Sequence, residues 1–451
     1  YFDHPPAIAW LIALVDHGRR DVLLVRAGPL LCGAGATFAL AGFAARVSAM
    51  RAAGAIAALL LNLTPLIAIA FTVATPDAPY LLAWSLALYA GHRALADDRL
   101  LDWLLLGVAV GLAVVSRELG VALLIGVAAA ALTGRRLARV APSGPLLAAA
   151  ACAAIVTPSI AWQAAHHWET VRFALQGRHV IGSWSMARLI SLLGTFAAAC
   201  SPGIAALCAW GLARSCRRNA PDNFLTAWTA LPLIVIASAL SLREPVETYW
   251  LAGPVVSLIG FASAAVAVVR IQAWIAAVVL APAVLETGFV LAAADAPQRL
   301  VSTALHAGGS GLKNNGPFEI FAYPAAARDL AMRTAGTGQW VLTDGYGLSS
   351  VLDFYGGVPP VVIGYDEQGR ESRNWYDPGA APASALFFDK EPLATRPDMR
   401  EALARACASV TVEPDLSYEY AGEPVRTFYV TRCDGLTPGG MRFLQYMGHG
   451  P

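Results

Sequence analysis

Long apolar runs separated by short polar turns fill the chain between residues 22 and 293. A helix needs roughly 20 apolar residues to cross a bilayer, so these runs predict about ten membrane-spanning helices. The fourth and fifth are short and joined only by Arg117-Glu118, so a single re-entrant hairpin is the alternative for that pair. The predicted spans are residues 22–45, 53–73, 77–95, 100–116, 119–134, 146–163, 189–213, 223–241, 249–269 and 272–293.

Every second loop between these spans is basic, which is the positive-inside pattern of membrane proteins. The loops at 46–52, 135–145 and 214–222 are therefore expected to be cytoplasmic. Because the number of spans is even, residues 1–21 and the segment after residue 293 are expected on the outer side. The basic residues are Arg46, Arg51, Arg93, Arg99, Arg135, Arg136, Arg139, Arg214, Arg217, Arg218 and Arg270.

Residues 1–21 precede the first predicted span and differ from it in pattern. Pro5 and Pro6 are typical of a helix start. The apolar run Ala7–Val15 that follows is too short to cross a bilayer, and Trp10 favours the membrane interface. We therefore expect an acidic loop followed by a helix that lies along the membrane surface.

Residues 294–451 have mixed composition and alternate strand and helix signals, which predicts a small α/β domain. Strands are expected at 340–343, 360–363, 385–388, 410–412 and 427–430, and helices at 324–335, 348–355 and 398–406. The expected fold class is therefore mostly α: a polytopic transmembrane helix bundle over 22–293, with a C-terminal α/β soluble domain in the periplasm.

Two cysteines, Cys407 and Cys433, flank two of the expected strands. In an oxidising compartment we expect them to form a disulfide. Two independent buried thiols are the alternative.

Composition agrees with a membrane protein. Hydrophobic residues make up 57% of the chain and charged residues 14%, against about 25% charged residues in soluble proteins. The net charge of +1 gives no indication of nucleic-acid binding. The sequence has neither a metal-binding motif nor a P-loop, so no metal or cofactor is expected, and ATP-driven transport is disfavoured.

Two acidic stretches place a carboxylate beside prolines, at points where a helix should begin: Tyr1-Phe2-Asp3-His4-Pro5-Pro6 and Ala74-Thr75-Pro76-Asp77-Ala78-Pro79. By the loop pattern Asp3 and Asp77 face the same outer compartment. A carboxylate close to a hydroxyl can act as general base, and an arginine can hold a phosphate. Transfer of a group from a lipid-linked phosphate would use both. The alternative is that Asp3 and Asp77 only cap helices.

The two stretches resemble the dolichyl-phosphate-mannose-protein mannosyltransferase family. They are most similar to its bacterial branch, which includes the aminoarabinose and galacturonic acid transferases that act on lipopolysaccharide. Further matches are Ser116-Arg117-Glu118, Trp162–Trp168 with Phe173, and Tyr249-Trp250-Leu251-Ala252, and in the tail Asp344, Phe354-Tyr355 and Tyr376-Asp377.

The resemblance implies a GT-C glycosyltransferase, transferring a hexosyl or pentosyl group from a polyprenyl-phosphate donor with inversion. Transfer would occur at the periplasmic face of the bacterial inner membrane, to a hydroxyl of a lipid, glycan or protein acceptor. Relatives carry an acidic pair after their first span, which we expect to precede Tyr1. The candidate residues are catalytic Asp3 and Asp77, and substrate-binding His4, Arg117, Glu118, His167, Arg172, Arg178, Arg243, Glu247 and Tyr249.

A transporter or flippase of lipid-linked sugars is the competing class. Such a protein would also be polytopic and acidic, but it needs no general base. The sizeable outer α/β domain favours an enzyme, and the gathering of charged residues on one face disfavours a structural assembly protein.

Overall fold

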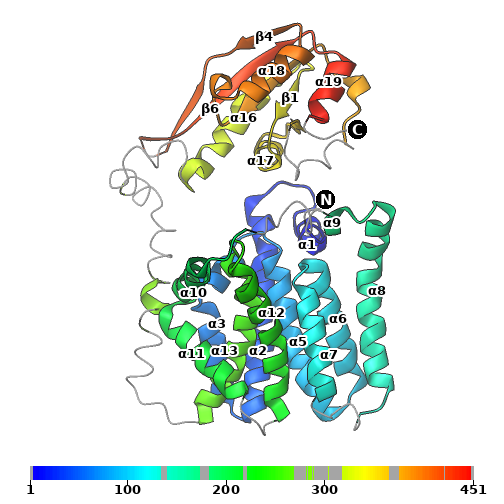
Figure 1. Ribbon diagram of the computed structural model, residues 1–451, viewed down its shortest axis with the longest axis vertical. Helices are drawn as coiled ribbons and strands as arrows, with labels where there is room; N and C mark the ends of the chain where they lie inside the picture. The colour runs from blue at the N-terminus through cyan, green and yellow to red at the C-terminus, as the bar shows by residue number, and fades with distance from the viewer. Residues whose placement is uncertain are drawn as a thin grey trace. The chain divides into compact units, whose positions relative to one another are not determined.

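The computed structural model describes residues 4–133, 140–172, 182–216, 221–268, 281, 283–286, 288, 303, 317–364, 375–420 and 422–447. They fall into two compact units, Tyr1–Val290 and Leu291–Pro451. The first is helical and the second is built on a β-sheet (Figure 1). The predicted fold class is confirmed: apolar helices long enough to span a membrane, followed by an α/β unit.

The long helices of the first unit run side by side, as Figure 1 shows. Four helices in the described part are long and apolar enough to cross a membrane, or five if the bent pair α10 and α11 counts as one span. The helices are α1 (Ala7–Asp16), α2 (Val22–Ser48), α3 (Arg51–Asn62), α4 (Pro65–Ala70), α5 (Asp77–Asp97), α6 (Leu100–Ser116), α7 (Gly120–Thr133), α8 (Ser143–Ala165), α9 (Glu169–Arg172), α10 (Met186–Cys200), α11 (Pro202–Ser215), α12 (Pro221–Ser241), the 3-10 turn η3 (Thr248–Leu251) and α13 (Ala252–Val268).

Two of the predicted spans are not single helices. Residues 189–213 form α10 and α11, which meet at 111°. Pro202 disfavours the helical conformation at Ser201, which instead adopts a positive φ of 67°. Residues 53–73 are divided in the same way, because α3 ends before Thr64 and α4 starts at Pro65. A proline therefore lies at each of these two breaks, whereas Pro29, Pro158 and Pro232 lie inside continuous helices.

The pair of short helices α6 and α7 is joined by a turn at Arg117, Glu118 and Leu119. Gly120 allows the turn to close, because a Cβ at this position would lie 2.3 Å from the backbone of Ala113. The polypeptide thus reverses direction in a tight turn, and the buried Arg117 is the first residue of that turn.

The centre of the helical unit is formed by α5 and α13. Trp84 of α5 is fully buried and its indole Nε1 donates to Ser257 Oγ at 2.8 Å. Gly253 makes this close packing possible, since a Cβ there would lie 2.7 Å from the Trp84 ring. The contact fixes the start of α13 against the start of α5.

The second unit has a mixed sheet with strand order β2-β1-β3-β6-β4, and β5 pairs with β6. Strand β1 is parallel to β2 and β3, and β6 is antiparallel to its neighbours. The strands are β1 (Trp340–Thr343), β2 (Val361–Val362), β3 (Ser384–Asp389), β4 (Ser409–Val412), β5 (Leu416–Tyr420) and β6 (Glu423–Asp434), and the helices α16 (Tyr323–Thr334), α17 (Tyr346–Gly356), α18 (Pro397–Ala406) and α19 (Pro438–Gln445).

Each face of this sheet is covered by its own pair of helices. Leu342 and Phe387 point into a core with α18 and α19, whereas Val341 and Phe388 point into a core with α16 and α17. This follows from the two-residue period of a strand. The unit is therefore a three-layer α/β sandwich.

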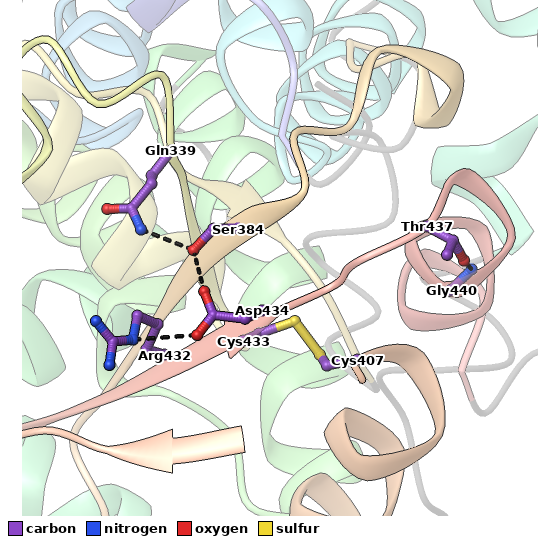
Figure 2. The surroundings of a disulfide bond; sticks show 8 residues. All are labelled: Gln339, Ser384, Cys407, Arg432, Cys433, Asp434, Thr437 and Gly440. Atoms are coloured by element: carbon purple, nitrogen blue, oxygen red, sulfur yellow. Dashed lines mark hydrogen bonds and ion pairs between the residues drawn. A yellow bond between two sulfur atoms is a disulfide. The ribbon is translucent and has the colours of Figure 1, made fainter. Parts of the chain in front are cut away.

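The sulfur atoms of Cys407 and Cys433 are joined in a disulfide that ties the end of α18 to β6, with Cα atoms 5.6 Å apart (Figure 2). Beside it, Ser384 Oγ donates to Asp434 Oδ1 at 2.7 Å and accepts from Gln339 Nε2 at 2.7 Å. The start of β3 and the end of β6 are thus held by a covalent bond and by polar contacts.

Candidate functional site

A cavity of 340 Å³ lies at the start of α5 in the helical unit. Its lining combines polar side chains, His4, Asp77, Arg117 and Tyr249, with apolar ones. The apolar side chains include Leu66, Ile69, Ala70 and Val73. Segments far apart in sequence therefore place charged and apolar side chains around one space.

Asp77 is the first residue of α5, and its carboxylate pairs with an arginine instead of acting as the N-cap. The N-cap residue is Pro76, and its position has no side-chain capping hydrogen bond. Instead Asp77 Oδ1 accepts from Arg117 Nη1 in an ion pair. A negative charge in the first turn is also favoured by the helix dipole.

Arg117 ends α6 with an extended backbone and is only 5% exposed. Its Cζ lies 4.5 Å from the centre of the Tyr249 ring, so the guanidinium is held between an aromatic face and the Asp77 carboxylate. Its Nε is buried without a hydrogen-bond partner among the described residues. The guanidinium therefore keeps a donor that its present neighbours do not use.

His4 lines the same cavity, just before α1. Its neighbour Asp3 lies outside the described residues, as does Arg178. Of the sequence-based candidates, the cavity therefore brings together Asp77, Arg117, His4 and Tyr249.

The remaining candidates are exposed and do not line the cavity: Glu118, His167, Arg172, Arg243 and Glu247. His167 follows α8 in a turn with a positive φ of 58°. Arg243 follows α12, and its Cζ lies 5.0 Å from the centre of the Trp184 ring. Among the candidate arginines that the structure describes, Arg117 is therefore buried, whereas Arg172 and Arg243 are exposed.

Two polar side chains close to the cavity were missed in the sequence. Thr75 lines it and has a buried hydroxyl without a partner among the described residues. Tyr80 is fully buried on α5, three residues after Asp77. A spacing of three residues puts the side chains of Asp77 and Tyr80 on one helix face. This spacing could have indicated Tyr80 from the sequence alone.

The C-terminal unit has a second charged cluster, where β1 and β3 end. Arg396 Nη1 donates to Asp344 Oδ2 at 2.7 Å and to Asp389 Oδ2 at 3.1 Å. Burial, and then the charge of Asp344, raise the pKa of Asp389 to about 6. In the described parts of both units, no group of three or more His, Cys, Asp or Glu side chains could hold a metal ion.

Residues 3–162 match the family model described as dolichyl-phosphate-mannose-protein mannosyltransferase, and the resemblance seen in the sequence is confirmed. No curated protein matches the chain.

Solved structures similar to this one include ArnT from Cupriavidus metallidurans bound to undecaprenyl phosphate, at 16% identity and a TM-score of 0.63. Its apo state is similar at 18% identity and a TM-score of 0.59, and both comparisons cover 96% of this chain and 88% of ArnT. The oligosaccharyltransferase AglB from Archaeoglobus fulgidus, in complex with an inhibitory peptide and a dolichol-phosphate, has a TM-score of 0.47 at 11% identity, covering 86% of this chain and 61% of AglB. The ArnT likeness shows a shared fold.

Proposed function

We propose that this chain, a member of the dolichyl-phosphate-mannose-protein mannosyltransferase family, transfers a sugar from a polyprenyl-phosphate donor to an acceptor hydroxyl. The acceptor belongs to a lipid, a glycan or a protein. Transfer takes place at the periplasmic face of the bacterial inner membrane, with the C-terminal unit on that side.

The observation that carries the proposal is the cavity that is lined both by the Asp77–Arg117 pair and by apolar side chains of α4. A polyprenyl phosphate has an anionic head and a long apolar tail, so it needs a cation next to an apolar surface. Arg117 supplies the cation with an unused donor, and α4 supplies the apolar surface. Arginine suits this task because its planar guanidinium matches phosphate oxygens.

The ArnT structure that shares this fold was determined with undecaprenyl phosphate bound. That ligand belongs to the class proposed here for the donor. It supports the proposal through the shared fold and leaves the sugar and the acceptor to experiment.

The reaction assigns a task to each charged group of the cavity. The acceptor oxygen attacks the anomeric carbon, and its proton passes to a carboxylate. The bond between the anomeric carbon and the phosphate oxygen breaks, and the lipid phosphate leaves with the electron pair. Arg117 stabilises the charge that develops there. Asp77 is the carboxylate that we place nearest to the acceptor, with Asp3 and the family's acidic pair as further candidates for the base.

The test is an assay in proteoliposomes with a polyprenyl-phosphate sugar labelled in its sugar. We expect labelled sugar to appear on an added hydroxyl acceptor, with one lipid phosphate released for each sugar transferred. A flippase would instead move the intact donor across the bilayer without releasing lipid phosphate. Movement of the donor without any transfer would contradict the proposal.

A further inference from the structure

Tyr80 of α5 carries a buried hydroxyl that has no hydrogen-bond partner in the part of the chain that the structure describes. Its ring packs edge-to-face on Trp84, with the ring centroids 5.4 Å apart. Burying an unpaired hydroxyl costs free energy, and phenylalanine would pack the same ring without that cost. The hydroxyl therefore lowers the stability of the resting fold. This cost points to a role for the hydroxyl in another state of the site.

The hydroxyl lies beside the segment at the start of α13 that lines the cavity. Tyr80 follows Asp77 by three residues on one helix, and helical side chains lean towards the N-terminus, so its ring lies over the turn that carries Asp77. A Cβ added to Gly253 would lie 2.8 Å from the hydroxyl, and the preceding residue, Ala252, lines the cavity.

A donor phosphate would compete with Asp77 for Arg117. In the resting structure the ion pair occupies Nη1 of the guanidinium. An anionic phosphate brings a second negative charge to the same group, which is only 5% exposed. When Arg117 turns towards the phosphate, the Asp77 carboxylate loses its donor in a place where an unpaired charge is costly.

We propose that Tyr80 is a positioning residue that replaces Arg117 as the hydrogen-bond donor to Asp77 when the donor phosphate binds Arg117. The phenolic O–H then donates a hydrogen bond to the Asp77 carboxylate, which keeps the carboxylate ionised and directed at the acceptor. Tyr80 acts through Asp77 and contacts neither donor nor acceptor. This inference rests on the proposed function and adds an exchange of partners to it: Arg117 holds Asp77 at rest, and Tyr80 holds it during transfer.

The first test is Tyr80→Phe in the full chain, which keeps the aromatic ring and removes only the hydroxyl. We expect kcat to fall by about tenfold or more, since a misdirected carboxylate loses much of a general base's contribution. The KM for the donor should change by less than about twofold, because Arg117 remains in place. Tm should be unchanged or higher, because the resting fold loses an unpaired buried hydroxyl.

The second test separates action through Asp77 from a general effect on packing. In an Asp77→Asn background, Tyr80→Phe should lower kcat no further, because the carboxylate that the hydroxyl would position is no longer present. Tyr89→Phe is the matched control: Tyr89 is on the same helix and its hydroxyl accepts from Arg93 Nη1 at 2.9 Å. This variant should keep the parent kcat.

Three results would overturn the inference: a Tyr80→Phe enzyme that transfers sugar at the parent rate, a lower Tm for that variant, or additive losses in the double variant. A lower Tm would mean that the hydroxyl already has a partner at rest. A parent protein that transfers no sugar would instead contradict the proposed function, so the two failures are distinguishable.

Discussion

At the scale of single residues, the account depends on Arg117, which has both a partner and an unused donor. It pairs with Asp77 across 40 residues of sequence and stacks on Tyr249. Loop patterning in the sequence indicated Arg117 as a phosphate ligand. The pairing with Asp77 depends on how α5, α6 and η3 converge, and no local pattern encodes that convergence. The sequence therefore indicated which residues could act, and packing determined which of them meet.

Arg117→Ala should weaken donor binding or lower turnover by about tenfold or more, on the order of 1.4 kcal/mol. The variant loses the cation proposed to bind the phosphate and leaves Asp77 without its partner. Binding of a radiolabelled polyprenyl phosphate, together with transfer kinetics, measures the effect. Arg99→Ala is the control, since Arg99 is exposed at the other end of α6 and does not line the cavity. Equal losses in both variants would remove Arg117 from its special role.

Asp389 provides a prediction on pH. Its pKa of about 6 lies above the value of about 3.9 for an unfolded chain. The contribution of Asp389 to the free energy of unfolding is therefore fully present below about pH 4. It is lost as the pH rises through about 6. Asp389→Asn removes this titration, so the stability of the C-terminal unit should vary less between those pH values.

Hydrogen-exchange protection of the β3 amides at a series of pH values measures the Asp389 effect. Asp398→Asn is the control, because Asp398 is a more exposed partner of the same Arg396. If Asp389→Asn keeps the full pH dependence of the parent, another group is responsible for it.

At the scale of elements, close packing between α5 and α13 holds the site together. A Cβ at Gly253 would lie 2.7 Å from Trp84 and 2.8 Å from the Tyr80 hydroxyl. Gly253→Ala should therefore lower the stability of the helical unit by about 1–3 kcal/mol through overpacking. Thermal unfolding in detergent measures this.

Gly194→Ala is the matched control for that substitution. Gly194 lies in α10, and a Cβ there would meet nothing within 4 Å. The control should be neutral or stabilising by up to about 1 kcal/mol, because alanine favours the helix more than glycine does. Equal Tm shifts in the two variants would contradict the packing argument.

Several elements of the C-terminal unit have the bounds that sequence patterns predicted, to within one residue. Trp340–Thr343 is β1 with the expected bounds, and the expected helix 398–406 is α18 with one residue added. Strand β5 was missed, although Leu416, Tyr418 and Tyr420 alternate with polar residues as a strand requires. The bend at Ser201 was missed because apolar periodicity continues through it, and only Pro202 marks it.

The disulfide between α18 and β6 should contribute roughly 3 kcal/mol to the C-terminal unit in the entropic model. Maleimide labelling of the denatured, non-reduced protein checks it. Cys216 is exposed and free and should be labelled, whereas Cys407 and Cys433 should not react until a reductant is added. Labelling of all three without reductant would contradict the bond.

At the scale of the whole molecule, the arginine pattern predicts which side each loop faces. Cysteine introduced at Val140 should be protected from a membrane-impermeant reagent in intact cells, because loop 135–145 is expected to be cytoplasmic. Cysteine introduced at the exposed Asp415, in the C-terminal unit, should be labelled. Labelling of position 140 from outside would reject this topology.

The central claim is that the cavity around Asp77 and Arg117 is the site of sugar transfer, and one comparison tests it most directly. Initial rates of transfer from a labelled polyprenyl-phosphate sugar are measured for the parent, Asp77→Asn and Asp97→Asn. Asp97 is at the other end of the same helix and pairs with Arg46. We predict that Asp77→Asn lowers the rate by about a hundredfold or more, within the range of general-base catalysis, while Asp97→Asn keeps the parent rate. Transfer by Asp77→Asn at the parent rate would contradict the claim.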